Sequence, residues 1–157
     1  PLSEDISATV ETGIENTFYA NIIISLDFSS SMYASDSGIV ENGVQITRYD
    51  AALDAMQSLL DNYQTRLESA DSGDVRVSLN GFAKSAVALG GSSDHPADQP
   101  FWCTLTEAKA IIEGLRDGTL QPDWNDIGVD TNYDAALQQI VSIYNQDAFE
   151  NRAPVTQ

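Results

Sequence analysis

The chain has 157 residues, 42% of them apolar, which is enough to bury the core of one globular domain. Seven Lys and Arg stand against 24 Asp and Glu, so the formal net charge is −17 at pH 7. A chain this negative repels nucleic acid and anionic membranes, which leaves cations and cationic groups as partners. No apolar run approaches the roughly 20 residues of a membrane-spanning helix. The single cysteine, Cys103, excludes an intrachain disulfide and a thiolate metal cluster.

A polar N-terminal stretch leads into the first predicted strand. Residues 1–18 mix Ser, Glu, Asp and Thr with scattered apolar residues, and we interpret them as a linker to a domain that spans residues 19–157. The strand runs from Asn21 to Asp27 and carries a nearly unbroken aliphatic run at positions 22–26. This pattern is typical of a central parallel strand that is covered on both faces.

Small oxygen-bearing side chains follow this strand and form a candidate site. Ligands of an open α/β sheet collect beyond the carboxyl ends of the strands, where Asp27, Ser29 and Ser31 stand. Residues two apart in an extended loop point the same way, so one carboxylate and two hydroxyls can converge. Because oxygen donors suit Mg²⁺ or Ca²⁺, we predict a metal site here. The alternative is that the serines only cap a helix or form a turn.

The middle of the chain alternates helices and strands. Residues 33–47 show little periodicity and predict a loop beside the candidate site. A helix from Tyr49 to about Leu67 follows, and then strands over residues 75–80 and 85–89 that predict an antiparallel hairpin at the sheet edge. The helix has its apolar residues three and four apart, at Ala52, Met56, Leu59, Leu60, Tyr63 and Leu67.

A capping pattern predicts where a second helix begins. Thr104 and Glu107 form a capping-box pattern, and Gly118 is the expected end of the helix. In the polar loop before it we expect His95 to be solvated, and we expect Cys103 to be packed as a small hydrophobe. The apolar stripe of the helix comprises Leu105, Ala108, Ile111, Ile112 and Leu115.

A third helix begins just after Thr131. It follows a loop in which Trp124 is expected to cover the end of the core, and its N-terminus faces the candidate metal. Helix N-termini disfavour cations, but the carboxylates of Asp27, Asp130 and Asp134 would offset that cost. Alternatively, Asp134 only caps the helix from its third position. The apolar positions that mark the helix are Tyr133, Leu137, Ile140, Val141 and Tyr144.

Two segments of the chain resemble one known family. Asp27-Phe28-Ser29-Ser30-Ser31 is similar to the Asp-x-Ser-x-Ser motif that begins the metal ion-dependent adhesion site of von Willebrand factor type A domains. The stretch from Asp130 to Leu137 resembles the second loop of that site, where a threonine at the position of Thr131 supplies a ligand. Among the members of this family, the sequence around Thr131 and the run Ile46-Thr47-Arg48 are most similar to A domains of giant repeats-in-toxin adhesins of Gram-negative bacteria.

The resemblance implies an α/β fold of the Rossmann-like A-domain type, with flanking helices and a mostly parallel sheet that has one antiparallel edge strand. It implies that Asp27 binds Mg²⁺ or Ca²⁺ directly or through water, that Ser29, Ser31 and Thr131 offer hydroxyl oxygens, and that an acidic group of a partner completes the shell. A complete A domain continues with a strand beside Asn21–Asp27 and a loop with a further aspartate. We therefore expect the missing C-terminal strands, the remaining part of the A domain, to come from another segment or chain.

The predicted function is a divalent-cation-dependent adhesion module of a bacterial surface or secreted adhesin, which binds an acidic group of a protein or glycan ligand. Two alternatives stay open: a metal-stabilised structural module of a large extracellular protein, or an intracellular A-domain assembly factor. We do not expect an enzyme, because no phosphate-cradling glycine loop follows a strand and no histidine is placed to activate Ser29 or Ser31.

Overall fold

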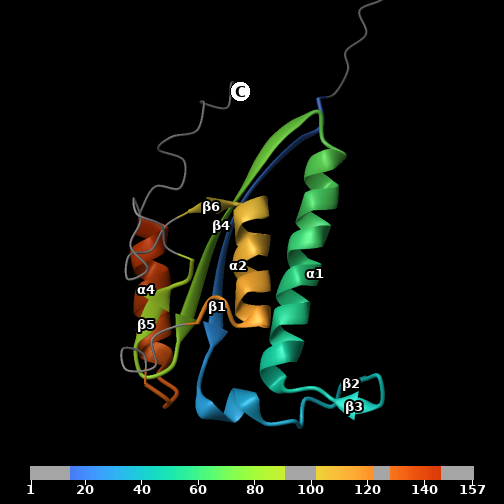
Figure 1. Cartoon of the computed structure of the whole chain (residues 1–157). Coiled ribbons are helices and arrows are strands. Elements are labelled where there is room, and N and C mark those ends of the chain that lie inside the picture. The colour runs from blue at the N-terminus through green and yellow to red at the C-terminus, as the bar shows by residue number, and fades with distance from the viewer. Residues whose placement is uncertain (1–14, 91–101, 122–127, 146–157) are drawn as a thin grey trace, which may run out of the picture.

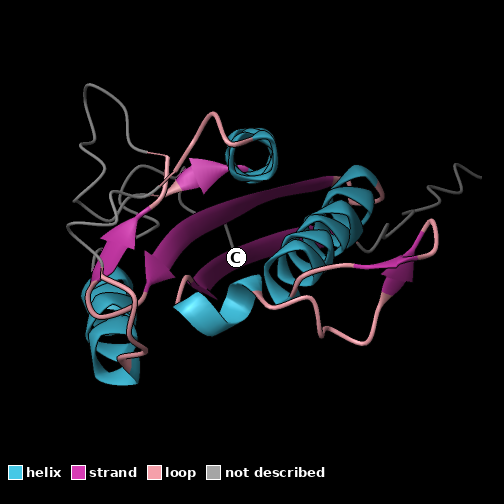
Figure 2. Ribbon diagram, turned by 60° about the horizontal axis from the view of Figure 1, so that its bottom comes forward, coloured by secondary structure: helices cyan, strands magenta, loops and turns pink. Residues whose placement is uncertain are grey.

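The computed structural model describes residues 15–90, 102–121 and 128–145, and it shows a sheet with helices on both faces (Figures 1 and 2). The predictions for the linker up to residue 14, for His95 and for Trp124 lie outside these residues. In chain order the elements are β1 (Thr17–Asp27), the 3-10 helix η1 (Ser30–Tyr33), β2 (Val40–Glu41), β3 (Val44–Gln45), α1 (Arg48–Glu68), β4 (Ser72–Phe82), β5 (Ala86–Ala88), β6 (Cys103–Thr104), α2 (Leu105–Asp117) and α4 (Tyr133–Asn145).

The sheet is built around one long parallel pair. β1 and β4 pair in parallel along their whole lengths, from Thr17 opposite Ser72 to Asp27 opposite Phe82. On its other edge β4 pairs antiparallel with the short strands β5 and β6. The structure therefore confirms a mixed α/β fold with a mostly parallel sheet. It also confirms the predicted antiparallel pairing of the strand over residues 85–89.

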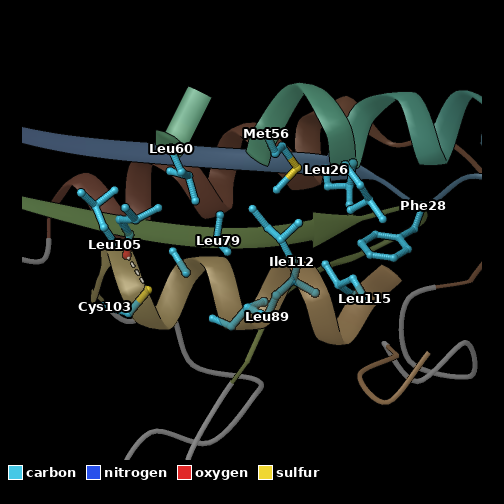
Figure 3. Packing of buried hydrophobic residues seen from close by; sticks show 14 of the residues in the cluster. Leu26, Phe28, Met56, Leu60, Leu79, Leu89, Cys103, Leu105, Ile112 and Leu115 are labelled. Carbon is cyan, nitrogen blue, oxygen red and sulfur yellow. Dashed lines mark hydrogen bonds between the residues drawn. The ribbon is translucent and has the colours of Figure 1, made fainter. Parts of the chain in front are cut away.

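The main hydrophobic core lies between the sheet and the two helices α1 and α2 (Figure 3). Alternate residues of β4, namely Val75, Val77 and Leu79, point into it and are at most 2% exposed. α1 contributes mainly Leu53, with Met56 and Leu60. The expected core residue Leu59 is 40% exposed, because the buried positions of α1 follow a stripe that passes through 53, 56 and 60 and leaves 59 on its flank.

α2 is the element that the sequence predicts best. The hydroxyl of Thr104 accepts a hydrogen bond from the Glu107 N–H and the Glu107 carboxylate accepts one from the Thr104 N–H, so the capping box is present. Gly118 ends the helix with a φ of 77°, a left-handed conformation that glycine adopts without strain. All five predicted stripe residues of this helix are buried, and so is Cys103, as expected.

α4 lies on the opposite face of the sheet from α1 and α2 (Figure 1). The helix is where the sequence predicts it, but its buried residues are Ala136 and Ile143. Four of the five apolar positions that mark it are 58–78% exposed: Tyr133, Leu137, Val141 and Tyr144. These positions predict the helix correctly, but the helix is rotated so that only one flank of its apolar surface meets the strands.

The segment that was predicted as a loop, residues 33–47, contains a small hairpin of β2 and β3. Its turn is Asn42-Gly43, and both residues have positive φ, 50° and 81°. Asn-Gly between two short apolar-polar pairs is a strong local signal for such a turn, so the hairpin was readable from the sequence. Its strands are exposed, and they stand away from the main sheet (Figure 2).

Candidate metal site

The candidate site begins where β1 ends. The Phe28 N–H donates to the Phe82 carbonyl over 2.7 Å, and the Phe28 side chain is 1% exposed beneath the loop that follows. Gly81 makes room for it, because a Cβ at that position would lie 2.5 Å from the Phe28 ring. Phe28 thus anchors the loop in the core, and Asp27 and Ser29 on either side of it are held at the carboxyl edge of the sheet.

The three predicted ligands of this loop come together. The Ser29 N–H donates to Asp27 Oδ1 over 2.7 Å, and the hydroxyl oxygens of Ser29 and Ser31 are 3.2 Å apart. Ser29 is 2% exposed, whereas Ser31 is exposed. The two hydroxyls therefore meet, one below the surface and one at it, although Ser31 lies in the 3-10 helix η1 and not in the extended loop that the prediction assumed.

The alternative interpretation, in which the serines serve as caps, has less support. Ser29 does occupy the N-cap position of η1, but its side chain makes no capping hydrogen bond. Its hydroxyl is instead paired with that of Ser31. A hydroxyl that caps a helix accepts from a backbone N–H of the first turn, so the geometry of Ser29 is not that of a cap.

The second predicted loop is tied to the first one through the backbone. The Ser30 N–H donates to the Val129 carbonyl over 3.1 Å, which brings the segment that carries Thr131 beside the serine loop. The same segment is fixed to the end of β4: the Asn132 N–H donates to the Ala83 carbonyl over 2.7 Å and its side-chain amide donates to the Lys84 carbonyl over 3.0 Å. Thr131 itself is exposed.

Asn132 is the residue of this site that sequence reasoning missed. Its Oδ1 accepts from the Ala135 N–H over 3.2 Å, so Asn132 caps α4 while its amide and backbone hold the loop to β4. An Asn directly before a helical apolar pattern is a cap signal that could have identified it. The alternative role of Asp134 as a capping residue at the third helical position is wrong, since Asp134 is the second residue of α4 and Ala135 the third.

Aromatic rings border the site on the side of α1. Phe28 packs against Tyr49 with ring centroids 5.5 Å apart, and Tyr49 stacks on Tyr33 at 5.2 Å. Burial, with a smaller contribution from Asp50, raises the pKa of Tyr49 to about 12. Burial likewise raises the pKa of Tyr33, helped by the neighbouring Tyr49. Both phenols are therefore neutral at physiological pH, so these two rings add no charge to the site.

The donors that the two loops offer are oxygen atoms of one carboxylate and of hydroxyls. Among the described residues no group of three or more His, Cys, Asp or Glu is placed to hold a metal ion, so a site of the zinc type is not seen there. A hard cation does not need such a group, since Mg²⁺ and Ca²⁺ bind carboxylate, hydroxyl and water oxygens. Asp27 fits that chemistry, because Oδ2 is left without a hydrogen-bond partner in the described part of the chain.

Comparisons with known proteins add no support to the resemblance to von Willebrand factor type A domains, which rests on the residues of the two loops alone. No model of a known protein family matches the chain, and no curated protein matches it either. In the segments that the structure describes, none of the helices has both the length and the apolar character to cross a bilayer.

Proposed function

We propose that the chain is a divalent-cation-dependent binding module of the von Willebrand factor A type. The observation that carries this proposal is the convergence of Ser29 Oγ and Ser31 Oγ, 3.2 Å apart, beside the Asp27 carboxylate. The backbone hydrogen bond from Ser30 to Val129 adds the loop of Thr131 to the same place. Asp27, Ser29, Ser31 and Thr131 would hold Mg²⁺ or Ca²⁺ through oxygen atoms.

The charge of this ligand set defines the partner. One carboxylate neutralises only half of the charge of a divalent ion, and hydroxyls add none, so the bound ion keeps an attraction for a further anion. An acidic group on a protein or glycan ligand would therefore complete the coordination shell. The role is that of a bridge in adhesion, and we propose an extracellular location on the surface of a bacterium or in a secreted adhesin.

The neighbourhood of α4 is compatible with a cation. The N-terminus of a helix carries a partial positive charge, which opposes the binding of a positive ion. Asp134 in the first turn of α4 and Asp130 just before it bring two carboxylates to this end of the helix. Both are exposed, so they can offset the helix dipole without being desolvated.

A structural role for the ion is the second candidate. The loop is already ordered by the protein's own hydrogen bonds, from Ser29 to Asp27 and from Ser30 to Val129. An ion added to such a loop would stabilise the folded state by mass action whether or not it also contacts a ligand. The two roles differ in whether a coordination position stays open to a partner.

Completion of the sheet is part of the proposal. Within the described residues no strand pairs with the second edge of β1, and Ile22, Ile23 and Ile24 are only partly buried. An open edge with aliphatic side chains attracts a further strand. We therefore propose that another segment or chain supplies the remaining strands beside β1.

Calorimetric titration with Mg²⁺, Ca²⁺ and Mn²⁺ tests the proposal. We expect saturable binding by the wild-type chain that Asp27→Ala abolishes. Because a chain of net charge −17 also attracts cations unspecifically, Glu41→Ala in the exposed β2 strand is the matched control: it removes the same charge and should leave the binding unchanged. Equal binding by wild type and Asp27→Ala would contradict the proposal. If the ion binds, the binding of an acidic peptide distinguishes the two roles: in the adhesive role, chelation of the metal should weaken peptide binding, and in the structural role there should be no such binding.

A further inference from the structure

The end of β4 and the turn that follows it contain none of the predicted metal ligands, yet both ligand loops are hydrogen-bonded to them. The serine loop is fixed by the Phe28 N–H, which donates to the Phe82 carbonyl. The β4–β5 turn comes next, and the Ala83 N–H closes it on the Ser85 carbonyl over 2.9 Å. This turn, η1 and the start of α4 lie at the same end of the molecule (Figure 1).

Asn132 makes three hydrogen bonds that hold the second loop to this turn. Its N–H donates to the Ala83 carbonyl over 2.7 Å, and its side-chain amide donates to the Lys84 carbonyl over 3.0 Å. Its Oδ1 accepts from the Ala135 N–H over 3.2 Å and so caps α4. One residue therefore joins the β4–β5 turn to the helix, and the cap uses only the oxygen of its side chain.

These contacts confine Thr131. The peptide unit between Thr131 and Asn132 is planar, so the bond that the Asn132 N–H makes to the turn also fixes the direction of the Thr131 carbonyl. At the other end of the loop, the Val129 carbonyl accepts from the Ser30 N–H over 3.1 Å. Thr131 and the residue before it lie between these two fixed points. The chain's own hydrogen bonds thus hold the backbone of Thr131 in place.

The loop also packs closely against the turn through side-chain carbons. A Cβ at Gly128 would lie 2.8 Å from Cβ and 3.4 Å from Cδ of Lys84, and Gly128 has a φ of 72°. A residue with a side chain at this position would push the stem of Lys84 away. The glycine therefore permits the close approach that the hydrogen bonds of Asn132 require.

We propose that Asn132 is a positioning residue of the ion site, which ties its loop to the β4–β5 turn and so holds Thr131 in place before the ion binds. This inference rests on the proposed function and adds to it what sets the affinity for the ion. Groups that orient metal ligands change metal affinity by roughly 10- to 100-fold. Because Asn132 is exposed to water, we expect the lower end of this range, about tenfold.

Two substitutions separate the tether from the cap. Ser and Asp cap helices as well as Asn does, so Asn132→Ser and Asn132→Asp keep an oxygen for the Ala135 N–H. The serine hydroxyl is too short to reach the Lys84 carbonyl as well, and a carboxylate cannot donate to it. In calorimetric titrations of the complete chain with Mg²⁺ and Ca²⁺, both variants should bind about tenfold more weakly than the wild type.

Asn132→Asp is the sharper of the two variants. A negative charge added beside a cation site would by itself strengthen binding, so weaker binding can only come from the lost tether. Gln138→Glu is the matched control, because it adds the same charge to an exposed position of α4 that makes no contact with the turn among the described hydrogen bonds. In about 0.15 M salt it should change the affinity less than about twofold.

Hydrogen exchange of the metal-free chain gives a readout that does not need the ion. In Asn132→Ser the backbone amides of Ser30 and of residue 132 should exchange roughly fivefold faster than in the wild type, because the loop is less firmly held. A residue that served only as a cap would leave both amides and the ion affinity unchanged in this variant.

The outcomes distinguish this inference from the proposed function. If the wild type binds the ion and Asp27→Ala does not, while both Asn132 variants bind as tightly as the wild type, Asn132 is only a cap and this inference alone is overturned. Tighter binding by Asn132→Asp than by the wild type would overturn it too, since charge would then outweigh the tether. If the wild type binds no ion, the inference fails together with the proposed function.

Discussion

The two faces of the sheet are built differently. On the face covered by α1 and α2, β4 presents Val75, Val77 and Leu79 to a continuous apolar core. On the face covered by α4, the alternate residues of the same strand include Ser78 and Asn80, which are also buried. Ser25 Oγ, Asn80 Oδ1 and Gln139 Nε2 have no hydrogen-bond partner in the described part of the chain. The first face therefore holds the fold together, and the second supports the candidate site with less apolar packing.

Truncation of one isoleucine on each face would measure this difference directly. Ile112 in α2 and Ile143 in α4 are both 0% exposed. We expect Ile112→Ala to lower the free energy of unfolding by about 4 kcal/mol, near the upper end for such changes, and Ile143→Ala by about 2 kcal/mol, because fewer apolar neighbours are lost. Urea titrations with a common m-value measure both. Equal losses would show that the two faces are packed alike.

The dependence of stability on alkaline pH should show how well the core under α1 and α2 shields Cys103 from water. Burial raises the pKa of this thiol to about 12, and its Sγ–H donates to the Val77 carbonyl over 3.2 Å. The folded chain then keeps a proton that the unfolded chain loses near pH 9. The resulting stabilisation is complete below about pH 9 and is lost as the pH rises towards about 12, by at most about 1.4 kcal/mol per pH unit.

The control for the pH experiment is Cys103→Ala. The stability of this variant is lower throughout because packing is lost, but it should fall less than that of the wild type between pH 9 and pH 10, the range in which the thiol contributes most and Tyr33 and Tyr49 contribute least. Urea midpoints at a series of pH values give the comparison. Parallel curves for the wild type and the variant would mean that the thiol is not shielded from water.

The smallest expected effect is a gain in stability, and it concerns the buried polar side chains between α4 and the sheet. Gln139→Met keeps the approximate shape of the side chain and removes a buried amide nitrogen that has no partner among the described residues. We expect stability to rise by up to about 1 kcal/mol, since a buried unsatisfied donor costs more than an apolar group of similar size. Thermal unfolding measures the change. A clear loss would indicate that an ordered water or a polar contact satisfies the amide.

Local sequence patterns predict much of the fold. The cap of α2 and the stripe from Leu105 to Leu115 are encoded within a few residues, and the structure reproduces them. The spacing of Asp27, Ser29 and Ser31 also predicts that they lie close together, and the two hydroxyls do meet, but through the turn of η1 and not through an extended loop. The Asn-Gly turn of the β2–β3 hairpin was equally local and was overlooked.

What the sequence by itself determined is the existence and order of the helices and of the long strands, and the position of an oxygen-rich loop after β1. Only the tertiary structure decided which flank of α4 meets the sheet, since its apolar residues surround more than one flank and the rotation depends on what lies opposite. It also decided that Asn132 joins the second loop to β4 and that β1 keeps one edge open among the described strands. These features are pairings between residues distant in the chain, which no local pattern specifies.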